Sequence, residues 1–522
     1  MGKKNVRELS EELGLPYIKT IEDEPKQELL SKLPIAYAKR YELLPIKSNE
    51  TSVVVVTSNP VDIYPFDDLR ILFKKEISLV LSDPMTVQIA INRHYAGSID
   101  SAEQVMTEIH EDESLEAITL DLEEPKDILD MDDEAPIIHL INTLLHQAVK
   151  DRASDIHIEP FERELSVRYR IDGVLFNIIT PPKQYQPLIT SRVKVMAGLN
   201  IAEKRLPQDG RIRLKIAGKD VDVRASVIPT SFGERIVLRL LERNDEVLNL
   251  AEIGLDEGVL GQIHNLIYQS HGIILVTGPT GSGKTTTLYS ALSEINSAEK
   301  NIITVEDPVE YQVQGIGQIQ VNQKIGLTFA SGLRSILRQD PDVIMIGEIR
   351  DTETAEIAIN ASLTGHLVFS TLHTNDSAGA ITRLSDMGIE PFLISSSVMA
   401  VLAQRLVRVL CRHCRTPYIP SVEQWRELRL DSIPEGIQIY KNQGCAECKN
   451  TGYSGRSGIY ELLFINDEIR KLINEKADSS IISKAALSNG MVSLKTDGVR
   501  KLKDGTTSIE ELLRVTQNEL AL

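Results

Sequence analysis

The chain has 522 residues, which is too long for one ordinary hydrophobic core and predicts three or four domains at roughly 150 residues each. Apolar residues make up 42% and charged residues 25%, so a wholly disordered or fibrous protein is excluded. The formal net charge is −18 and only 5% of the residues are aromatic, which disfavours nucleic-acid binding through a basic surface or through base stacking.

The first 95 residues are expected to form a small α/β domain. Residues 51–57 (TSVVVVT) are a β-branched strand, residues 65–74 a helix and residues 77–80 a second strand. An acidic stretch follows at 96–135, where fifteen acidic residues and one basic residue give a net charge of −14. Because such a segment repels itself, we interpret it as a solvated linker, with an acidic docking segment as the alternative.

Two larger domains are expected next. Residues 135–151 place apolar side chains at helical spacing and begin a domain at 136–245, whose strands are predicted at 165–170, 211–216 and 236–241. Residues 246–404 alternate apolar strands with helical patterns, which predicts a mostly parallel sheet covered by helices on both faces. A cysteine module at 405–460 and a helical domain at 461–522 complete the predicted order.

The strongest motif is GPTGSGKT at residues 278–285, which fits the phosphate-binding pattern GxxxxGK[ST]. An apolar strand precedes it, and a helix with Leu288, Leu292 and Ile295 on one face follows it. Backbone amides of such a loop and the helix dipole bind phosphate, Lys284 reaches the β- and γ-phosphates, and the Thr285 hydroxyl binds Mg²⁺. The predicted nucleotide-binding residues are Gly278, Pro279, Thr280, Gly281, Ser282, Gly283, Lys284, Thr285 and Thr286.

Acidic residues that hold the metal or aim water are expected at two strand ends. Residues 343–348 (VIMIGE) have the layout of a Walker B strand, so Glu348 is expected to orient the attacking water or to hold Mg²⁺ through water. Residues 303–310 (ITVEDPVE) end in clustered acids, and Glu306 or Glu310 is expected to share one of these roles. Each of the three glutamates has the alternative of a solvated strand end.

Histidines and arginines supply further candidates. His366 and His373 flank an apolar strand, and His366 is placed where a γ-phosphate sensor is possible, although a structural role is equally open for each. An arginine supplied by a neighbouring subunit can neutralise charge in the transition state. The candidates of the second domain are Arg211, Arg224, Arg235 and Arg239, each with surface solubility as the alternative.

The only cysteines are Cys411, Cys414, Cys445 and Cys448, which form two CxxC pairs. Two such pairs brought together across a loop create a tetrahedral sulfur site for zinc, whereas disulfides are improbable in a reducing cytosol. Four thiolates leave no ligand position open, so the expected role of Zn²⁺ is structural. The alternative is four unrelated buried thiols.

No membrane span is expected, because the longest apolar runs, such as 273–276 and 343–346, have the length of strands. The first residues are charged and carry no signal-peptide pattern. The chain is therefore expected to be cytoplasmic, with any attachment to a membrane made through a partner.

These motifs together resemble the secretion ATPase superfamily, and within it the type II secretion ATPases. The stretches that carry the resemblance are ASDIHIEP at 153–160, RLPQDGR at 205–211, GPTGSGKTTTLY at 278–289, EDPVE at 306–310, LRQDPDVIMIGEIRD at 337–351, TGHLVFSTLHTND at 364–376, the paired CxxC module and GYSGRSGIYE at 452–461.

The resemblance implies a multidomain α/β fold in which a RecA-like P-loop ATPase core follows an α+β, PAS-like domain and carries the zinc module near its C-terminal end. It implies ATP hydrolysis by homo-hexameric rings, with 303–310 as the Asp box, 343–348 as Walker B and 364–373 as the His box. Arg211, Arg224, Arg334 and Arg338 match positions used near phosphates.

The implied partners are an inner-membrane platform protein, bound by the N-terminal domain, and a polytopic inner-membrane assembly protein. The implied activity powers assembly of a periplasmic pseudopilus that exports folded proteins across the outer membrane. A type IV pilus extension ATPase is the nearest alternative, because it shares almost the same core. A RecA-like nucleic-acid motor with a zinc ribbon and a non-catalytic scaffold that only holds ATP are the alternatives from other classes.

Overall fold

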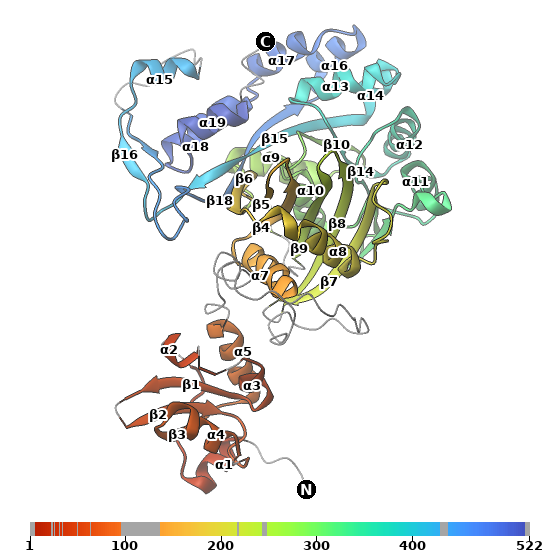
Figure 1. Cartoon of the computed structure of the whole chain (residues 1–522). Helices are drawn as coiled ribbons and strands as arrows, with labels where there is room; N and C mark the ends of the chain where they lie inside the picture. Colours follow the sequence, from red (N-terminus) through yellow and green to blue (C-terminus); the bar gives the residue numbers. More distant parts are fainter. Residues whose placement is uncertain are drawn as a thin grey trace. The chain divides into compact units, whose positions relative to one another are not determined.

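The computed structural model divides the chain into two units, residues 1–243 and 244–522, which are described separately (Figure 1). The predicted acidic linker lies outside the described residues, and the finer division into six parts stays a prediction. No helix among the described residues combines the length and the apolar character that crossing a bilayer requires. The structure describes residues 6–516 except for 22–24, 26, 31, 34, 50, 63, 96–135, 217–218, 243–247 and 429–436.

The N-terminal part is a three-stranded sheet in the order β1-β2-β3, with β1 and β2 antiparallel and β2 and β3 parallel. Buried valines of β2 and leucines of β1 form its core with helix α5. The predicted strands at 51–57 and 77–80 and the helix at 65–74 are confirmed to within one or two residues. The elements are α1 (Val6–Leu13), α2 (Gln27–Leu30), α3 (Ile35–Arg40), β1 (Leu43–Ser48), β2 (Ser52–Thr57), α4 (Tyr64–Phe73), β3 (Glu76–Leu81) and α5 (Pro84–Tyr95).

The rest of the first unit is a six-stranded antiparallel sheet in the order β6-β5-β4-β9-β8-β7, so the predicted α+β domain is confirmed. One face of the sheet buries apolar side chains against α7 and α8, as Ile156 of β4 and Leu144 of α7 illustrate. The elements are α7 (Pro136–Lys150), β4 (Ala153–Pro160), β5 (Leu165–Ile171), β6 (Val174–Ile179), η2 (Lys183–Tyr185), α8 (Gln186–Met196), β7 (Gln208–Ile216), β8 (Lys219–Thr230) and β9 (Gly233–Glu242).

The second unit contains a seven-stranded sheet in the order β12-β11-β13-β14-β10-β15-β18, in which all neighbours are parallel except β15 and β18. Both faces are apolar: Leu275 of β10 belongs to the cluster with α11 and α12, and Val276 belongs to the cluster with α9 and α10. The predicted mostly parallel α/β core is therefore confirmed. Its strands are β10 (Gly272–Thr277), β11 (Ile302–Glu306), β12 (Ile316–Gln320), β13 (Val343–Ile346), β14 (Leu367–Leu372), β15 (Val398–Leu410) and β18 (Tyr453–Phe464).

Helices cover both faces of this sheet, as Figure 1 shows, and they connect its parallel strands except β11 and β12, which are joined by residues 307–315 without a helix. Connections of this kind are required because the carboxyl end of one parallel strand must return to the amino end of the next. The elements are α9 (Glu257–Ile267), α10 (Lys284–Ile295), η3 (Gln323–Ile325), α11 (Phe329–Ile336), α12 (Thr352–Leu363), α13 (Ser377–Asp386) and α14 (Pro391–Ser397).

The cysteine module is an excursion between β15 and β18, whose antiparallel pairing runs from Ala400↔Phe464 to Leu410↔Tyr453. The predicted boundaries of the module, 405 and 460, fall inside these two strands. Both strands belong to the main sheet, and the module begins only where β15 ends and finishes where β18 begins. The C-terminal helices return to the sheet, where Arg408 donates to the buried Glu511 of α19 at 2.8 Å. The elements are β16 (Thr416–Tyr418), α15 (Val422–Glu427), β17 (Ile439–Lys441), α16 (Asp467–Asn474), α17 (Ser479–Ser488), α18 (Leu494–Lys503) and α19 (Ile509–Thr516).

Candidate active site

The candidate site lies along one edge of the seven-stranded sheet, where its parallel strands end. The P-loop follows β10, Glu348 follows β13, His373 follows β14 and Glu306 ends β11. Because these strands are parallel and hydrogen-bonded neighbours, their carboxyl ends meet at the same edge. Ligands of open α/β sheets bind at this edge, so the sequence motifs converge where a nucleotide site is expected.

The P-loop makes a tight turn between β10 and α10. Gly281 and Gly283 have φ angles of 79° and 86°, a left-handed conformation that favours glycine, and α10 begins directly afterwards at Lys284. A Cβ atom on Gly278 would lie 2.5 Å from the backbone oxygen of Gln404, so a larger residue cannot fit there. The glycines of the motif are thus explained by backbone geometry and by close contact with β15.

Gln404 of β15 is a site residue that sequence reasoning missed. Its side chain is buried, and its Nε2 donates to the backbone oxygen of Ser282 at 2.6 Å. Its Oε1 accepts a hydrogen bond from Thr287 Oγ1 at 2.9 Å. One amide therefore ties the P-loop to the helix that follows it. No local pattern announces this residue, since it lies more than a hundred positions downstream in the chain.

Lys284 is mostly buried at the first position of α10. Its Nζ donates to the backbone oxygens of Gly278 at 2.7 Å and Pro279 at 3.2 Å. Burial lowers the pKa of Lys284 to about 8, with Glu348 opposing this shift and Arg405 adding to it. An ammonium that is so poorly solvated gains much from an anionic ligand, as a phosphate-binding lysine must.

Glu348 is held in place by two neighbours. Its Oε2 lies 3.1 Å from Nε2 of His373, and its Oε1 forms an ion pair with Arg350. Glu348 also acts electrostatically on Lys284, so the predicted Walker B carboxylate and the P-loop lysine share one site. The Glu348 side chain is 16% exposed, which leaves it accessible to a water molecule.

The two candidate histidines lie at opposite ends of β14. His373 follows the carboxyl end, beside Glu348, whereas His366 precedes the amino end, where its Nδ1 lies 2.8 Å from the backbone oxygen of Ala361. A strand of this length separates the two residues by roughly 20 Å. His366 therefore does not share the edge that carries its own subunit's P-loop, so the structure does not support its predicted role as a γ-phosphate sensor at that loop. His373 lies at the edge that carries the P-loop, beside Glu348.

The two glutamates of the 303–310 segment differ sharply in environment. Glu306 is 3% exposed and accepts hydrogen bonds from Tyr289, Thr304 and Gln318. Burial raises the pKa of Glu306, and these three hydrogen bonds oppose the shift. Glu310 is exposed at the start of the following loop. Of the two, Glu310 is the one that solvent can reach.

The predicted arginines Arg211 and Arg224 belong to the first unit. Both lie in a row across one face of the six-stranded sheet, in which Arg211 pairs with Arg224, Arg224 with Arg239 and Arg239 with Asp155. Arg239 donates to Asp155 at 2.9 Å. The row presents several guanidinium groups on one surface, as an anion-binding role requires.

The remaining predicted arginines lie on other elements. Arg235 of β9 forms an ion pair with the buried Glu159. Arg334 on α11 forms an ion pair with Glu353, and Arg338 donates to the backbone oxygen of Arg334 at 2.7 Å. These contacts hold the arginines in place. They do not test the prediction that the arginines contact phosphate.

The P-loop fits a nucleotide phosphate group chemically. The Ser282 hydroxyl is buried in the loop and has no hydrogen-bond partner within the part of the chain that the structure describes. Thr285 is exposed in the first turn of α10, next to Lys284. A phosphate would satisfy the Ser282 hydroxyl, and a hydroxyl at position 285 suits a Mg²⁺ ligand.

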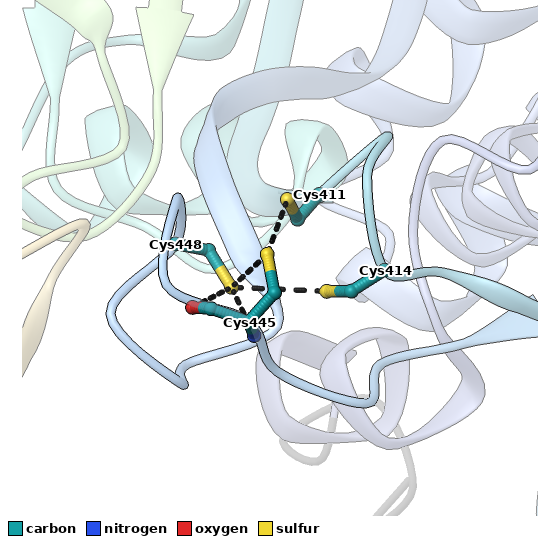
Figure 2. A group of neighbouring side chains, drawn as sticks. All are labelled: Cys411, Cys414, Cys445 and Cys448. Carbon is teal, nitrogen blue, oxygen red and sulfur yellow. Dashed lines mark hydrogen bonds between the residues drawn. The ribbon is translucent and has the colours of Figure 1, made fainter.

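The four cysteines come together as predicted (Figure 2). Their sulfur atoms all lie within 4.8 Å of one another, with Cys411–Cys445 at 3.9 Å and Cys414–Cys448 at 3.7 Å. Sulfur atoms at about 2.3 Å from a tetrahedral Zn²⁺ would lie about 3.8 Å apart, which matches these separations.

Backbone amides of the module also point at one sulfur. Those of Cys445 and Gly452 each donate to the sulfur of Cys448 at 3.2 Å. Burial would raise the pKa of Cys448, but these amides and the neighbouring thiols bring it down to about 6. A thiolate, the form that binds metal, is thereby favoured at this position.

Comparison with known proteins agrees with this geometry. The family described as "Type II/IV secretion system protein" matches residues 130–514, and the MshEN domain matches residues 13–100. The chain belongs to the type II/IV secretion system protein family. It is 48% identical over 500 residues to type II secretion system protein E of Dickeya dadantii, covering 94% of this chain and 98% of that protein.

Two further similarities concern a curated relative and a solved structure. The type IV pilus assembly ATPase PilB of Myxococcus xanthus is 43% identical over 509 residues, which cover 97% of this chain and 89% of PilB. The X-ray structure of the Legionella pneumophila ATPase DotB shares the fold, with a TM-score of 0.54 at 22% identity, over 74% of this chain and 98% of DotB. The predicted resemblance is confirmed, and the chain is an ATPase rather than a scaffold that only holds ATP.

Proposed function

We propose that this secretion ATPase hydrolyses ATP to drive assembly of a periplasmic pseudopilus, which exports folded proteins across the outer membrane by type II secretion. The observation that carries the catalytic part is the convergence of Lys284, Glu348 and His373 at one sheet edge. Near-complete coverage of a relative named for type II secretion supports the branch. Assembly of a type IV pilus is the second candidate, favoured by the similarity to PilB.

The residues of the edge divide the work of hydrolysis. Backbone amides of the 278–285 loop and the Lys284 ammonium bind and orient the β- and γ-phosphates. Glu348 orients the attacking water and accepts its proton, while His373 holds the carboxylate in position through the 3.1 Å contact. The Thr285 hydroxyl would hold Mg²⁺, and the bound ion would supply positive charge against the phosphate oxygens.

The cysteine module would hold Zn²⁺ through Cys411, Cys414, Cys445 and Cys448. All four ligand positions of a tetrahedral ion are filled by sulfur, so the metal has no position left for water. Its role is to stabilise a segment that leaves the main sheet after β15 and returns at β18.

Assembly and attachment extend the proposal. The ATPase would form a homo-hexameric ring in which Arg211 and Arg224 meet the nucleotide of a neighbouring subunit, because both belong to the row of guanidinium groups on the six-stranded sheet. The protein would be cytoplasmic and peripherally attached to the inner membrane. Its N-terminal domain would bind the platform protein, and a polytopic assembly protein would receive the movement of the ring.

The catalytic proposal is tested with two variants of the full-length, assembled protein. Lys284→Ala is expected to lose both MgATP binding and phosphate release. Glu348→Gln is expected to bind MgATP with near wild-type affinity and to release phosphate at least about 100-fold more slowly, because a positioned base contributes that much or more. Normal turnover in Glu348→Gln would move the base to Glu310 or Glu306.

The branch is tested by using the full-length chain as bait for membrane proteins of its own cell. Capture of a platform protein from a type II secretion operon supports the proposal, and capture from a pilus operon supports the second candidate. A DNA-binding assay across salt concentrations addresses the nucleic-acid motor, which requires tight and salt-sensitive binding.

A further inference from the structure

A buried polar cluster surrounds Glu306, and apart from Glu306 itself its residues have no catalytic role in the site described above. We name it the Tyr289 cluster: Tyr289, Thr304, Glu306 and Gln318. The Tyr289 hydroxyl donates to Glu306 Oε2 at 2.5 Å, and Thr304 Oγ1 donates to Oε1 at 2.5 Å. Gln318 Nε2 lies 3.2 Å from Glu306 Oε1 and 3.1 Å from the Tyr289 oxygen. Both carboxylate oxygens are therefore engaged.

The cluster also grips the loop that carries Glu310. Gln318 donates to the backbone oxygen of Tyr311 at 2.8 Å and accepts from the backbone amide of Val313 at 2.9 Å. The Tyr311 ring meets the Tyr289 ring edge-on, with centroids 5.4 Å apart. The start of this loop is thus held from two sides.

Tyr289 connects the loop to the phosphate-binding end of α10. It is fully buried and lies five residues after Lys284 on the same helix, about 7.5 Å along the helix axis. A helix is stiff over this length, so the position of the Tyr289 hydroxyl relative to Lys284 is nearly fixed. Gln318 hydrogen-bonds both to that hydroxyl at 3.1 Å and to the backbone oxygen of Tyr311, the residue after Glu310, at 2.8 Å.

The environment of Glu306 argues against its use as a base. Burial raises the pKa of Tyr289, so the tyrosine stays a hydrogen-bond donor. Burial also raises the pKa of Glu306, but the hydrogen bonds donated by Thr304, Tyr289 and Gln318 oppose that shift and favour the carboxylate as their acceptor. A carboxylate with both oxygens occupied and 3% exposure has no surface to offer a water molecule. Glu310 is exposed, and the cluster holds the backbone of the next residue, Tyr311.

We propose that Tyr289 and Gln318, acting through the buried Glu306, are positioning residues that hold Glu310 at a set distance from the P-loop lysine during ATP hydrolysis. The proposal rests on the proposed ATPase mechanism and on a role for Glu310 in it. It reassigns Glu306 from a candidate base to the acceptor that fixes the Tyr289 hydroxyl.

The first test compares steady-state hydrolysis by full-length variants. Tyr289→Phe removes the hydroxyl and keeps the ring, and it is expected to lower kcat about tenfold with KM for ATP changed less than about twofold, because the phosphate-binding loop is untouched. Glu306→Gln still accepts from the Tyr289 hydroxyl through its amide oxygen, so it should keep at least about a fifth of kcat. A loss of 100-fold or more in Glu306→Gln would identify Glu306 as the base and overturn the proposal.

The second test is a double-mutant cycle. It distinguishes a positioning role from a merely structural one, because only a positioning role predicts that the two losses of kcat are not additive. If Tyr289 acts through Glu310, then Tyr289→Phe should lower kcat about tenfold in the wild-type background and less than about twofold in the Glu310→Gln background. Additive losses, or no loss in Glu310→Gln alone, would overturn the proposal. Gln318→Met, which removes the amide and keeps the length, replaces Tyr289→Phe in the cycle if the latter does not fold.

Controls separate failure of this inference from failure of the proposed function. Tyr453→Phe removes another buried tyrosine hydroxyl of the same unit, one that lies 2.7 Å from Ser508 beside the cysteine module, and should leave kcat unchanged. Wild-type protein and Glu348→Gln are assayed in parallel. One outcome would refute the positioning role alone. In it, the wild-type protein hydrolyses ATP, Glu348→Gln does not, and the losses in the double-mutant cycle are additive. The ATPase mechanism would then remain intact.

Discussion

Gln404 is expected to control both the stability of the ATPase core and its affinity for nucleotide. Gln404→Leu keeps the approximate volume of the side chain but removes the donor to Ser282 at 2.6 Å and the acceptor for Thr287 at 2.9 Å. Each buried partner left unsatisfied costs about 1–3 kcal/mol. Because the Thr287 hydroxyl can rotate toward another acceptor, we expect a total of roughly 2–4 kcal/mol.

The loss should appear in two measurements. In differential scanning calorimetry the transition that responds to ATP should fall by roughly 5–10 °C, since a domain of this size loses a few degrees for each kcal/mol. In isothermal titration calorimetry the Kd for MgATP should rise about tenfold, because a P-loop that lacks one bond worth about 1.4 kcal/mol occupies its binding conformation less often.

Thr287→Val is the matched control for Gln404→Leu. It removes only the bond between Thr287 and the Gln404 oxygen and leaves the bond to the P-loop in place. About half the fall in melting temperature is expected, with the Kd for MgATP changed less than about threefold. Wild-type melting and wild-type affinity in Gln404→Leu would refute the reasoning, as would equal losses of affinity in the two variants.

Two further expectations concern the metal and the protonation of the P-loop. Cys411→Ser should lose stoichiometric zinc by elemental analysis and lower the melting temperature, while MgATP affinity stays at the wild-type value; zinc retained at one ion per chain would contradict this. Because burial holds the pKa of Lys284 at about 8 and a triphosphate raises it, MgATP binding at pH 8.5 should take up protons, approaching one per site as the pH rises further. Titration calorimetry in two buffers of different ionisation enthalpy measures this uptake. Its absence in the wild-type protein would show that the lysine is not the group involved.

The motifs formed by residues close together in the chain could be predicted from the sequence. The strands Gly272–Thr277 and Val343–Ile346 were predicted within their observed bounds, because an apolar run between turn residues is a local pattern. The P-loop and the two CxxC pairs are likewise set by short spacings that only a few structures satisfy. For these features the side chains that act together are also neighbours in the sequence.

The contacts around these motifs required the tertiary structure. The sheet order β13-β14-β10-β15 decides that His373 rather than His366 lies beside Glu348, and that Gln404 reaches the P-loop. The residues next to a single histidine or glutamine in an apolar strand do not indicate which distant side chain it contacts. The same holds for the row of arginines, which depends on the register of four antiparallel strands.

The sequence by itself thus predicted a nucleotide-phosphate site at residues 278–285 and a metal site of four cysteines, because both sites are made of closely spaced residues. Only the tertiary structure decided which carboxylate faces solvent and which is buried. Glu306 and Glu310 are four residues apart and chemically alike, but Tyr289 and Gln318, brought from α10 and β12, occupy one of them and leave the other exposed.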